Sequence, residues 1–154
     1  MSLNSEVPMH EGSPQDRWLR DDLSANAAKC TLAYWHRPLF SSGPHGPSEQ
    51  VRHAWRVLHD FDVDVVLAGH DHLYERFAPQ DPDGRPDPVR GIRQFTVGTG
   101  GATRYTPRTV ALNSEAIGQD WGVLVLTLDR DSYRWEFSPV AGAVFRDSGN
   151  AACH

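Results

Sequence analysis

The sequence predicts an α/β fold in which a βαβ unit is followed by antiparallel strands, with flanking helices. Two short apolar runs, residues 30–35 and 63–68, are typical of buried strands, and a helical pattern lies between them. Two later stretches, 122–128 and 133–137, flank the polar segment 129–132, which indicates a hairpin. The 154 residues suffice for one domain with a core of its own.

Two helices are predicted from capping residues and apolar spacing. Ser13 is a suitable N-cap, Pro14 fits the first helical position, and the apolar stripe of Trp18, Leu19 and Leu23 extends to about Ala28. A second helix opens at residues 47–49 and runs to about Asp60. Its apolar positions are Val51, Ala54, Trp55 and Leu58. Because this helix connects the first two strands, those strands should be parallel.

The other segments are expected to be mostly irregular. A third strand is predicted at 92–97, a tight turn at 98–101, and one more strand in the tail beyond Val140. The segments predicted as irregular or as loops are 1–13, 36–48, 69–76, 79–91 (the last exposed and rich in Pro and Asp) and 102–119.

Composition narrows the classes of function. The net charge of -5 argues against a general nucleic-acid binder, which would present a basic face. No apolar run approaches the length of a membrane span, and the N-terminus shows no signal-peptide pattern. The two cysteines, Cys30 and Cys153, leave three alternatives open: they pair with each other, they stay free, or they pair with other segments.

Histidines follow both strands of the predicted βαβ unit. Gly69-His70-Asp71-His72 comes directly after the second strand, and His36 follows the first. Parallel neighbouring strands bring their carboxyl ends to one rim, so these imidazoles should converge there. Imidazole is the commonest metal-binding side chain, which indicates a metal site, whereas isolated loop histidines are the ordinary alternative.

Three strings of this sequence resemble the purple-acid-phosphatase-like branch of the calcineurin-like metallophosphoesterases. They are WHRPLFSSGPHG, VDVVLAGHDHLYER and GIRQFTVGTGGA. The resemblance covers residues 14–147 and implies the C-terminal half of a β-sandwich domain, a partial metallophosphoesterase fold. Residues 1–13 then form an irregular N-terminal segment and 148–154 a tail.

The resemblance also implies roles for individual residues. His36 and His70 match ligands of the family's second metal, and His72 matches a ligand of the first. His45 lies where the family places a histidine near the substrate phosphate, where it can assist the leaving group. Glu49 is similar to an acidic residue that supports this histidine. Tyr74 and Arg76 match positions that we interpret as structural support.

The sequence departs from the family pattern in its carboxylate and amide ligands. It contains no Gly-Asp dipeptide and no Gly-Asn-His, which the family uses for the bridging aspartate and the asparagine ligand. Three neutral imidazoles cannot offset the repulsion between two divalent ions. We therefore expect a chain that is inactive alone and binds one metal ion weakly or none. The intact parent would bind two ions of Fe, Zn or Mn and hydrolyse phosphate esters.

Other interpretations compete with the phosphoesterase. The chain could be a non-catalytic metal-binding or self-associating module, or a regulatory domain with one structural zinc site. A homo-oligomer would form through the face that the missing N-terminal half leaves exposed. We expect no nucleic-acid or membrane partner. The parent's localisation follows only from the resemblance, which implies secretion or another extracytoplasmic location. A P-loop, a serine-hydrolase elbow and an EF-hand have no support in the sequence.

Overall fold

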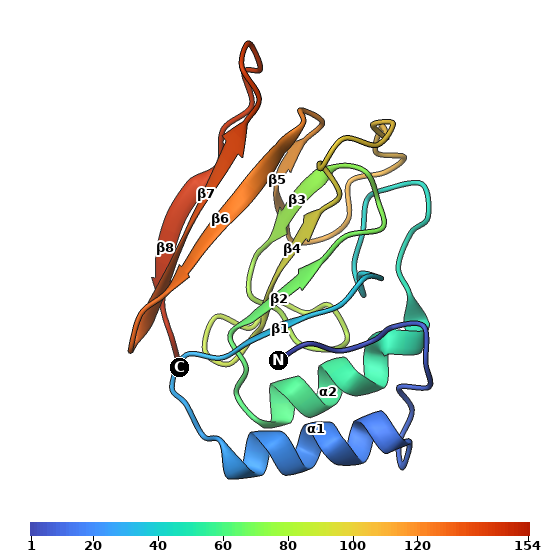
Figure 1. Ribbon diagram of the computed structural model, residues 1–154, viewed down its shortest axis with the longest axis vertical. Coiled ribbons are helices and arrows are strands. Elements are labelled where there is room, and N and C mark those ends of the chain that lie inside the picture. The colour runs from blue at the N-terminus through green and yellow to red at the C-terminus, as the bar shows by residue number, and fades with distance from the viewer.

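A computed structural model describes all residues 1–154, arranged in three layers (Figure 1). Helices cover one face of a five-stranded sheet, and a three-stranded sheet covers the other. The elements are α1 (Pro14–Ala25), β1 (Leu32–Tyr34), η1 (Glu49–Val51), α2 (Arg52–Asp60), β2 (Val65–Ala68), β3 (Tyr74–Phe77), β4 (Arg93–Val97), β5 (Ser114–Gly118), β6 (Gly122–Leu128), β7 (Ser132–Pro139) and β8 (Ser148–Ala152). This mixed α/β architecture of two sheets confirms the predicted fold class.

The larger sheet has the strand order β1-β2-β4-β3-β5. β1, β2 and β4 are mutually parallel, as predicted for the βαβ unit, while β3 is antiparallel to both β4 and β5. The N-terminal segment contributes to this sheet, although the sequence predicted it as irregular. Ser2 forms a parallel bridge with Tyr34, and the Leu3 amide donates to the Tyr34 carbonyl at 2.9 Å. Leu3 is buried in the hydrophobic core, which holds this segment against β1.

Two hydrophobic clusters lie on the opposite faces of the larger sheet, because side chains alternate along a strand. Val66 belongs to the cluster beneath the helices, which includes Trp55 and Leu19. Its neighbour Val65 belongs to the cluster between the sheets, which includes Phe95 and Trp135. The strands are therefore buried on both faces, which explains their continuous apolar runs.

The first helix follows the predicted capping pattern but is shorter than predicted. The Ser13 hydroxyl accepts from the Asp16 amide at 3.1 Å, and Pro14 opens α1. The helix ends at Ala25, not at Ala28, because the Asn26 amide closes it on the Asp22 carbonyl. The second helix begins with the 3-10 turn η1. Neither helix is both long and apolar enough to cross a membrane.

Two strands lie in segments that the sequence predicted as loops. β3 occupies the end of the predicted loop 69–76, and β5 occupies part of the predicted loop 102–119. The charged residues that obscured β3 are paired in the structure. Glu75 accepts from Ser42 and Ser114, and Arg76 pairs with Asp147. The hairpin of β6 and β7 and the final strand β8 were both predicted.

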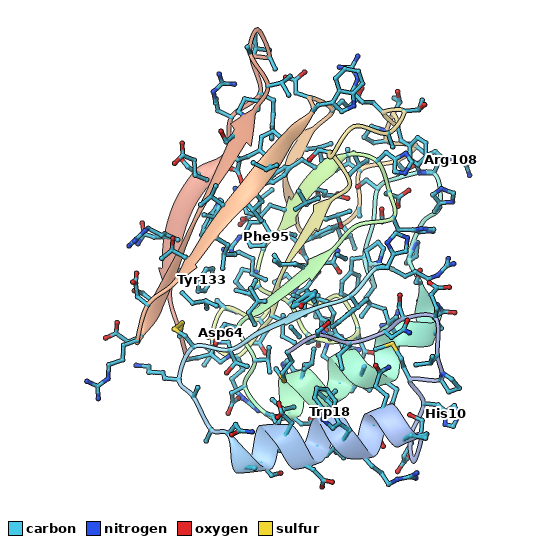
Figure 2. All side chains as sticks on the ribbon, viewed as in Figure 1. His10, Trp18, Asp64, Phe95, Arg108 and Tyr133 are labelled. Carbon is cyan, nitrogen blue, oxygen red and sulfur yellow. A yellow bond between two sulfur atoms is a disulfide. The ribbon has the colours of Figure 1, made fainter.

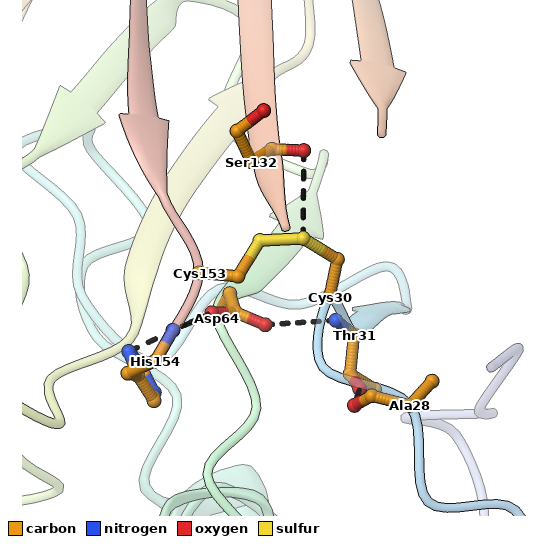
Figure 3. Close-up of a disulfide and its surroundings, with 7 residues drawn as sticks. All are labelled: Ala28, Cys30, Thr31, Asp64, Ser132, Cys153 and His154. Carbon is orange, nitrogen blue, oxygen red and sulfur yellow. Dashed lines mark hydrogen bonds and ion pairs between the residues drawn. A yellow bond between two sulfur atoms is a disulfide. The ribbon is translucent and has the colours of Figure 1, made fainter. Parts of the chain in front are cut away.

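Cys30 and Cys153 form a disulfide that joins the start of the first strand to the end of the chain (Figure 3). Next to it, the buried Asp64 carboxylate accepts from the Thr31 amide at 2.8 Å and the His154 amide at 3.0 Å. Of the three alternatives left open by the sequence, the structure thus shows the internal pair. It fixes the three-stranded sheet to the edge of the five-stranded one.

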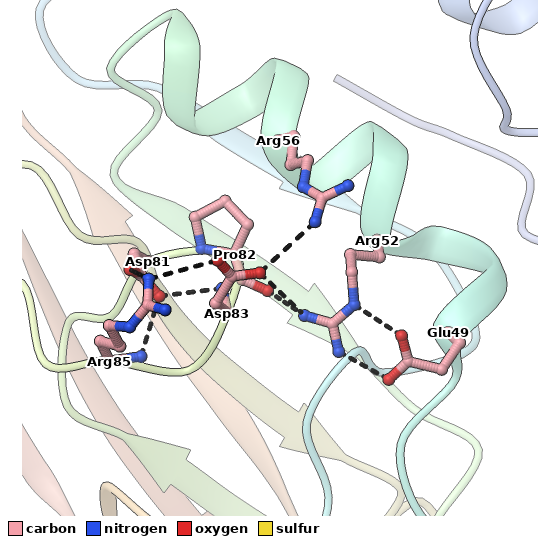
Figure 4. Close-up of polar contacts among 7 residues, drawn as sticks. All are labelled: Glu49, Arg52, Arg56, Asp81, Pro82, Asp83 and Arg85. Carbon is pink, nitrogen blue, oxygen red and sulfur yellow. Dashed lines mark hydrogen bonds and ion pairs between the residues drawn. The ribbon is translucent and has the colours of Figure 1, made fainter.

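The predicted exposed loop 79–91 is held to the second helix by charged contacts (Figure 4). Arg52 donates to the Pro82 carbonyl and pairs with Glu49, while Arg56 donates to Asp83 at 3.4 Å. Gln80 at the base of this loop is buried and bridges to Ile92. The loop is therefore polar but packed against the body of the protein.

Candidate metal centre

Three loops meet at the rim formed by the carboxyl ends of β1, β2 and β4. Because these strands are adjacent and parallel, the segments 35–46, 69–73 and 98–112 all leave the sheet on this side. The Gly69 amide donates to the His36 carbonyl at 3.0 Å, which continues the pairing of β1 and β2 past the strand ends. The two histidines that follow these strands are thereby brought together.

His36 and His70 are in direct contact. His70 Nδ1 lies 3.1 Å from His36 Nε2, and the ring centroids are 4.9 Å apart. Arg37, which can only donate, lies 3.3 Å from His70 Nε2. The two imidazoles therefore face each other through Nε2 of His36 and Nδ1 of His70. This arrangement is what the sequence predicted for the rim.

The left-handed backbone conformation of this loop falls on His70, with φ 65, rather than on Gly69. Histidine is one of the residue types that tolerate this region. Partial burial, followed by electrostatic interactions with His45 and Arg37, lowers the pKa of His70. The neutral imidazole, which is the form that binds metals, is therefore favoured.

The His36–His70 pair fits one side of a metal site. Ring nitrogens about 2.1 Å from a common ion, at a tetrahedral angle, are separated by about 3.4 Å. The 3.1 Å between Nε2 of His36 and Nδ1 of His70 is close to that separation. No cluster of three or more His, Cys, Asp or Glu side chains is close enough to complete a site. The structure thus brings together two imidazoles that could hold a metal ion.

His72 lies on the same rim but has no direct contact with His36 or His70. Its Nδ1 donates to the Thr103 carbonyl at 2.8 Å, and its ring stacks on Tyr105 with centroids 4.2 Å apart. A backbone carbonyl can only accept, so the proton is on Nδ1 and Nε2 is left as the acceptor. Metal-binding histidines commonly donate their second nitrogen in this way.

His45 lies above His70, with ring centroids 4.4 Å apart. Its amide donates to Asp71 Oδ1 at 3.1 Å, and its Nε2 lies 3.5 Å from the Tyr105 hydroxyl. The side chain is exposed and thus accessible to a ligand. Glu49, which the resemblance linked to this histidine, forms its ion pair with Arg52 instead.

The carboxylates near the histidines are used to hold the loops. Asp71 is fully buried and accepts from the Ser41 hydroxyl and the His45 amide. Glu75 is also fully buried and accepts from the Ser42 amide at 2.8 Å. Both carboxylates therefore join the segment after β1 to the segment after β2.

Tyr74 and Arg76 connect the two sheets, which agrees with a supporting position. The Tyr74 hydroxyl donates to Asp147 Oδ2 at 2.6 Å, and Arg76 Nε donates to the same oxygen at 2.8 Å. Trp135 Nε1 is a third donor to it at 3.0 Å. Burial alone would raise the pKa of Asp147, but these donors outweigh it and lower that pKa.

Comparisons with known proteins show what this chain is similar to. The model of the calcineurin-like phosphoesterases matches residues 1–74. Purple acid phosphatase 21 of Arabidopsis thaliana is 37% identical over 105 residues, covering 64% of this chain and 24% of that protein. These matches support a purple-acid-phosphatase-like metallophosphoesterase fragment. An acid phosphatase of Aspergillus ficuum is 31% identical over 99 residues, covering 62% of this chain and 16% of that protein.

Solved structures show the same fold for this chain. The purple acid phosphatase PPD1 from yellow lupin seeds has a TM-score of 0.84 at 20% identity, covering 98% of this chain and 30% of that one. GAP50, the anchor in the inner membrane complex of Plasmodium, has a TM-score of 0.78 at 19% identity, covering 99% of this chain and 48% of that one. The chain thus spans about a quarter of the length of Arabidopsis phosphatase 21. Purple acid phosphatases are metal-dependent and have a binuclear centre.

The sequence did not indicate two side chains of the rim, Arg37 and Tyr105. Arg37 contacts His70 and pairs with Glu6 at 2.7 Å. Tyr105 contacts both His45 and His72. The signal for Tyr105 was the strand β4, because the segment that follows a third parallel strand must leave at the same rim.

Proposed function

We propose that this chain carries the histidine side of a dinuclear phosphoesterase centre that hydrolyses phosphate monoesters or diesters. His36 and His70 would be ligands of one metal and His72 a ligand of the other. The observation that supports this most is the pairing of His36 Nε2 and His70 Nδ1 at 3.1 Å, on the rim where two parallel strands end. The metals would be drawn from Fe, Zn and Mn, which suit imidazole ligands.

The chain's own residues would position and protonate the substrate. When bound, metal ions of such a centre polarise phosphoryl oxygens and activate water. His45, exposed above His70, would contact the substrate phosphate and donate a proton to the leaving-group oxygen. Its backbone amide is fixed by the buried Asp71, so its loop keeps the imidazole over the pair. We propose that these 154 residues supply no bridging carboxylate to hold two metals together, since the sequence contains no Gly-Asp dipeptide.

Metal binding tests the ligand assignment. We expect titration calorimetry of the 154-residue chain to detect at most one weakly bound Zn²⁺ or Mn²⁺. The variants His36→Ala and His70→Ala should each abolish this binding, whereas His10→Ala, an exposed histidine outside the rim, should leave it unchanged. Binding that survives the loss of His36 would contradict the assignment.

We also propose that the chain alone does not turn over substrate, because it lacks the carboxylate ligands. Hydrolysis of an aryl phosphate with Zn²⁺, Mn²⁺ or Fe²⁺ should not exceed the rate without protein. Robust turnover that disappears in His70→Ala would show that the three imidazoles suffice and that this part of the proposal is wrong.

The Cys30–Cys153 disulfide supports residence of the parent in an oxidising, extracytoplasmic compartment, which we propose as its location.

Self-association is a second candidate, favoured by the free edge of β6. This strand pairs with β7 on one side only, and its sequence, Gly122–Leu128, contains no charged residue. Val123 and Val125 are 60% and 53% exposed, and an apolar groove of about 410 Å³ lies beside the strand, lined in part by Trp35, Leu67 and Val97. Natural proteins usually protect such edges with charges or a covering segment. We propose that a second copy pairs its own β6 here in antiparallel fashion.

Sedimentation velocity tests this interface. The wild type should form a dimer at high concentration, and Val125→Lys should be monomeric because a charge on an edge strand blocks pairing. Val144→Lys places the same charge on an exposed loop residue and should still dimerise. A wild type that stays monomeric throughout would exclude the self-associating module.

A further inference from the structure

The segment 102–111, called here the rim loop, is attached to both histidine loops. Its Thr103 carbonyl accepts from His72, and its Tyr105 amide donates to the His72 carbonyl at 2.9 Å. Farther on, the Arg108 amide donates to the Ser42 carbonyl at 3.0 Å. Figure 2 labels Arg108 on this side of the molecule, far from Trp18 on helix α1. The rim loop thus spans from the second histidine loop to the first.

Tyr105 is the side chain of the rim loop that contacts the histidines. Its ring lies parallel to His72, at 18° and 4.2 Å between centroids. Its other contact is with His45, whose ring centroid is 5.4 Å away and whose Nε2 is 3.5 Å from the Tyr105 hydroxyl. Tyr105 is half-buried, whereas its neighbours Arg104 and Thr106 are exposed. One aromatic ring therefore touches a proposed metal ligand and the proposed phosphate contact at once.

We infer that Tyr105 is a positioning residue, which holds His72 by stacking and orients His45 through its hydroxyl. The functional consequence of this inference rests on the proposed function: Tyr105 would fix the position of His45, the phosphate contact, relative to His72, the metal ligand. The two contacts use different parts of the side chain, so they can be removed separately. Tyr105→Phe removes the hydroxyl and keeps the ring, and Tyr105→Leu removes both.

The positions of the rings are read first from the metal-free chain by nuclear magnetic resonance at one fixed pH. The wild type should show nuclear Overhauser effects from the Tyr105 ring to the rings of His72 and His45. In Tyr105→Phe the His72 ring protons should keep their shifts while those of His45 move. In Tyr105→Leu the His72 protons should move downfield as well, because the ring current of the stacked tyrosine is lost. Trp18→Leu, a loss of an exposed aromatic ring on α1, should change neither histidine.

Phosphate binding then tests the link to function. With Zn²⁺ present, phosphorus nuclear magnetic resonance should show that inorganic phosphate binds several-fold more weakly to Tyr105→Phe and to His45→Ala than to the wild type. The double variant should be no weaker than His45→Ala alone, because the hydroxyl acts only through that histidine. Fully additive losses, or His45 shifts that are unchanged in Tyr105→Phe, would overturn the inference.

The two measurements separate the inference from the proposed function. If the wild type does not bind phosphate, the proposed phosphate contact of His45 fails for this chain, while the ring contacts still confirm or reject Tyr105 as the residue that orients His72 and His45. If phosphate binds but the Tyr105 variants leave both histidines and the affinity unchanged, the proposed function stands and the role of Tyr105 is rejected.

Discussion

Asp71 lies between His70 and His72 and is fully buried, so its surroundings determine how this loop is held. Its carboxylate accepts from Ser41 and from the His45 amide, while its backbone passes directly beneath Gly98. A Cβ at position 98 would overlap the Asp71 carbonyl and the His72 Cα. The glycine after β4 is therefore required by the close approach of the histidine loop.

Replacing Gly98 with Ala should destabilise the protein and displace the histidine loop. Overpacking of this kind costs about 1–3 kcal/mol, which urea denaturation can measure. The matched control is Gly100→Ala, since a Cβ there meets no atom within 4 Å. Equal free energies of unfolding for the two variants would show that the histidine loop can move away from a Cβ at position 98 without loss of stability.

At the residue scale, the sequence could predict His36 and His70 because a general rule about parallel strands applied to them. Each histidine follows a strongly apolar run, and such runs end on one rim. The same rule places the segment after β4 at this rim, but the choice of Tyr105 within it could not be predicted, since it depends on backbone contacts with His72. The partner of Glu49 was also unpredictable, because Arg52 three residues later competes with any loop contact.

At the scale of the elements, strands with continuous apolar sequence were predictable and those stabilised by tertiary partners were not. β2 is buried on both faces and reads as Val-Val-Leu-Ala. β3 reads as Tyr-Glu-Arg-Phe, with charges that become acceptable only when Ser42, Ser114 and Asp147 are near. β5 is an edge strand that pairs only with β3, so its own sequence carries little signal.

Removing the disulfide should destabilise the attachment of β8. The bond closes a long loop between Cys30 and Cys153, which lie 123 residues apart. Loss of such a link costs about 2–5 kcal/mol, largely because the unfolded chain becomes less constrained. The double variant Cys30→Ser/Cys153→Ser should therefore unfold at lower urea concentration.

Reduction of the wild type provides the matching control for that variant, because it breaks the same bond without changing the side chains. The reduced wild type and the serine variant should unfold at similar urea concentrations, and the amides of β8 should exchange faster in both. A serine variant as stable as the oxidised protein would show that the hydrogen bonds of β7 and β8 hold the strand by themselves.

At the scale of the whole molecule, the two sheets are joined by buried polar groups as well as by apolar packing. Asp147, just before β8, accepts from Tyr74 and Arg76 on β3 and from Trp135 on β7. The Arg76 and Arg93 guanidiniums both lie 5.1 Å from the Trp135 ring centroid. Since β3 follows directly from the histidine loop, this contact between sheets also supports the rim.

The charge of Asp147 should make the stability of the assembled sandwich sensitive to acid. Its pKa is lowered in the folded state, because the donors from Arg76 and Tyr74 outweigh the effect of burial. A carboxyl with a lowered pKa stabilises the fold above its unfolded pKa of about 3.9 and loses that contribution as the pH falls through the folded value. The wild type should therefore lose stability below about pH 4.

Asp147→Asn should lose less stability than the wild type below about pH 4, since an amide does not ionise. At neutral pH the variant should be less stable than the wild type. Urea midpoints measured from pH 7 downward would give both profiles. Asp129→Asn, on the turn between β6 and β7 where it pairs with Arg134, is the control and should keep the slope of the wild type. If the Asp147 variant loses stability as steeply as the wild type below pH 4, other carboxyls must govern acid unfolding, and the contact between the sheets does not depend on this charge.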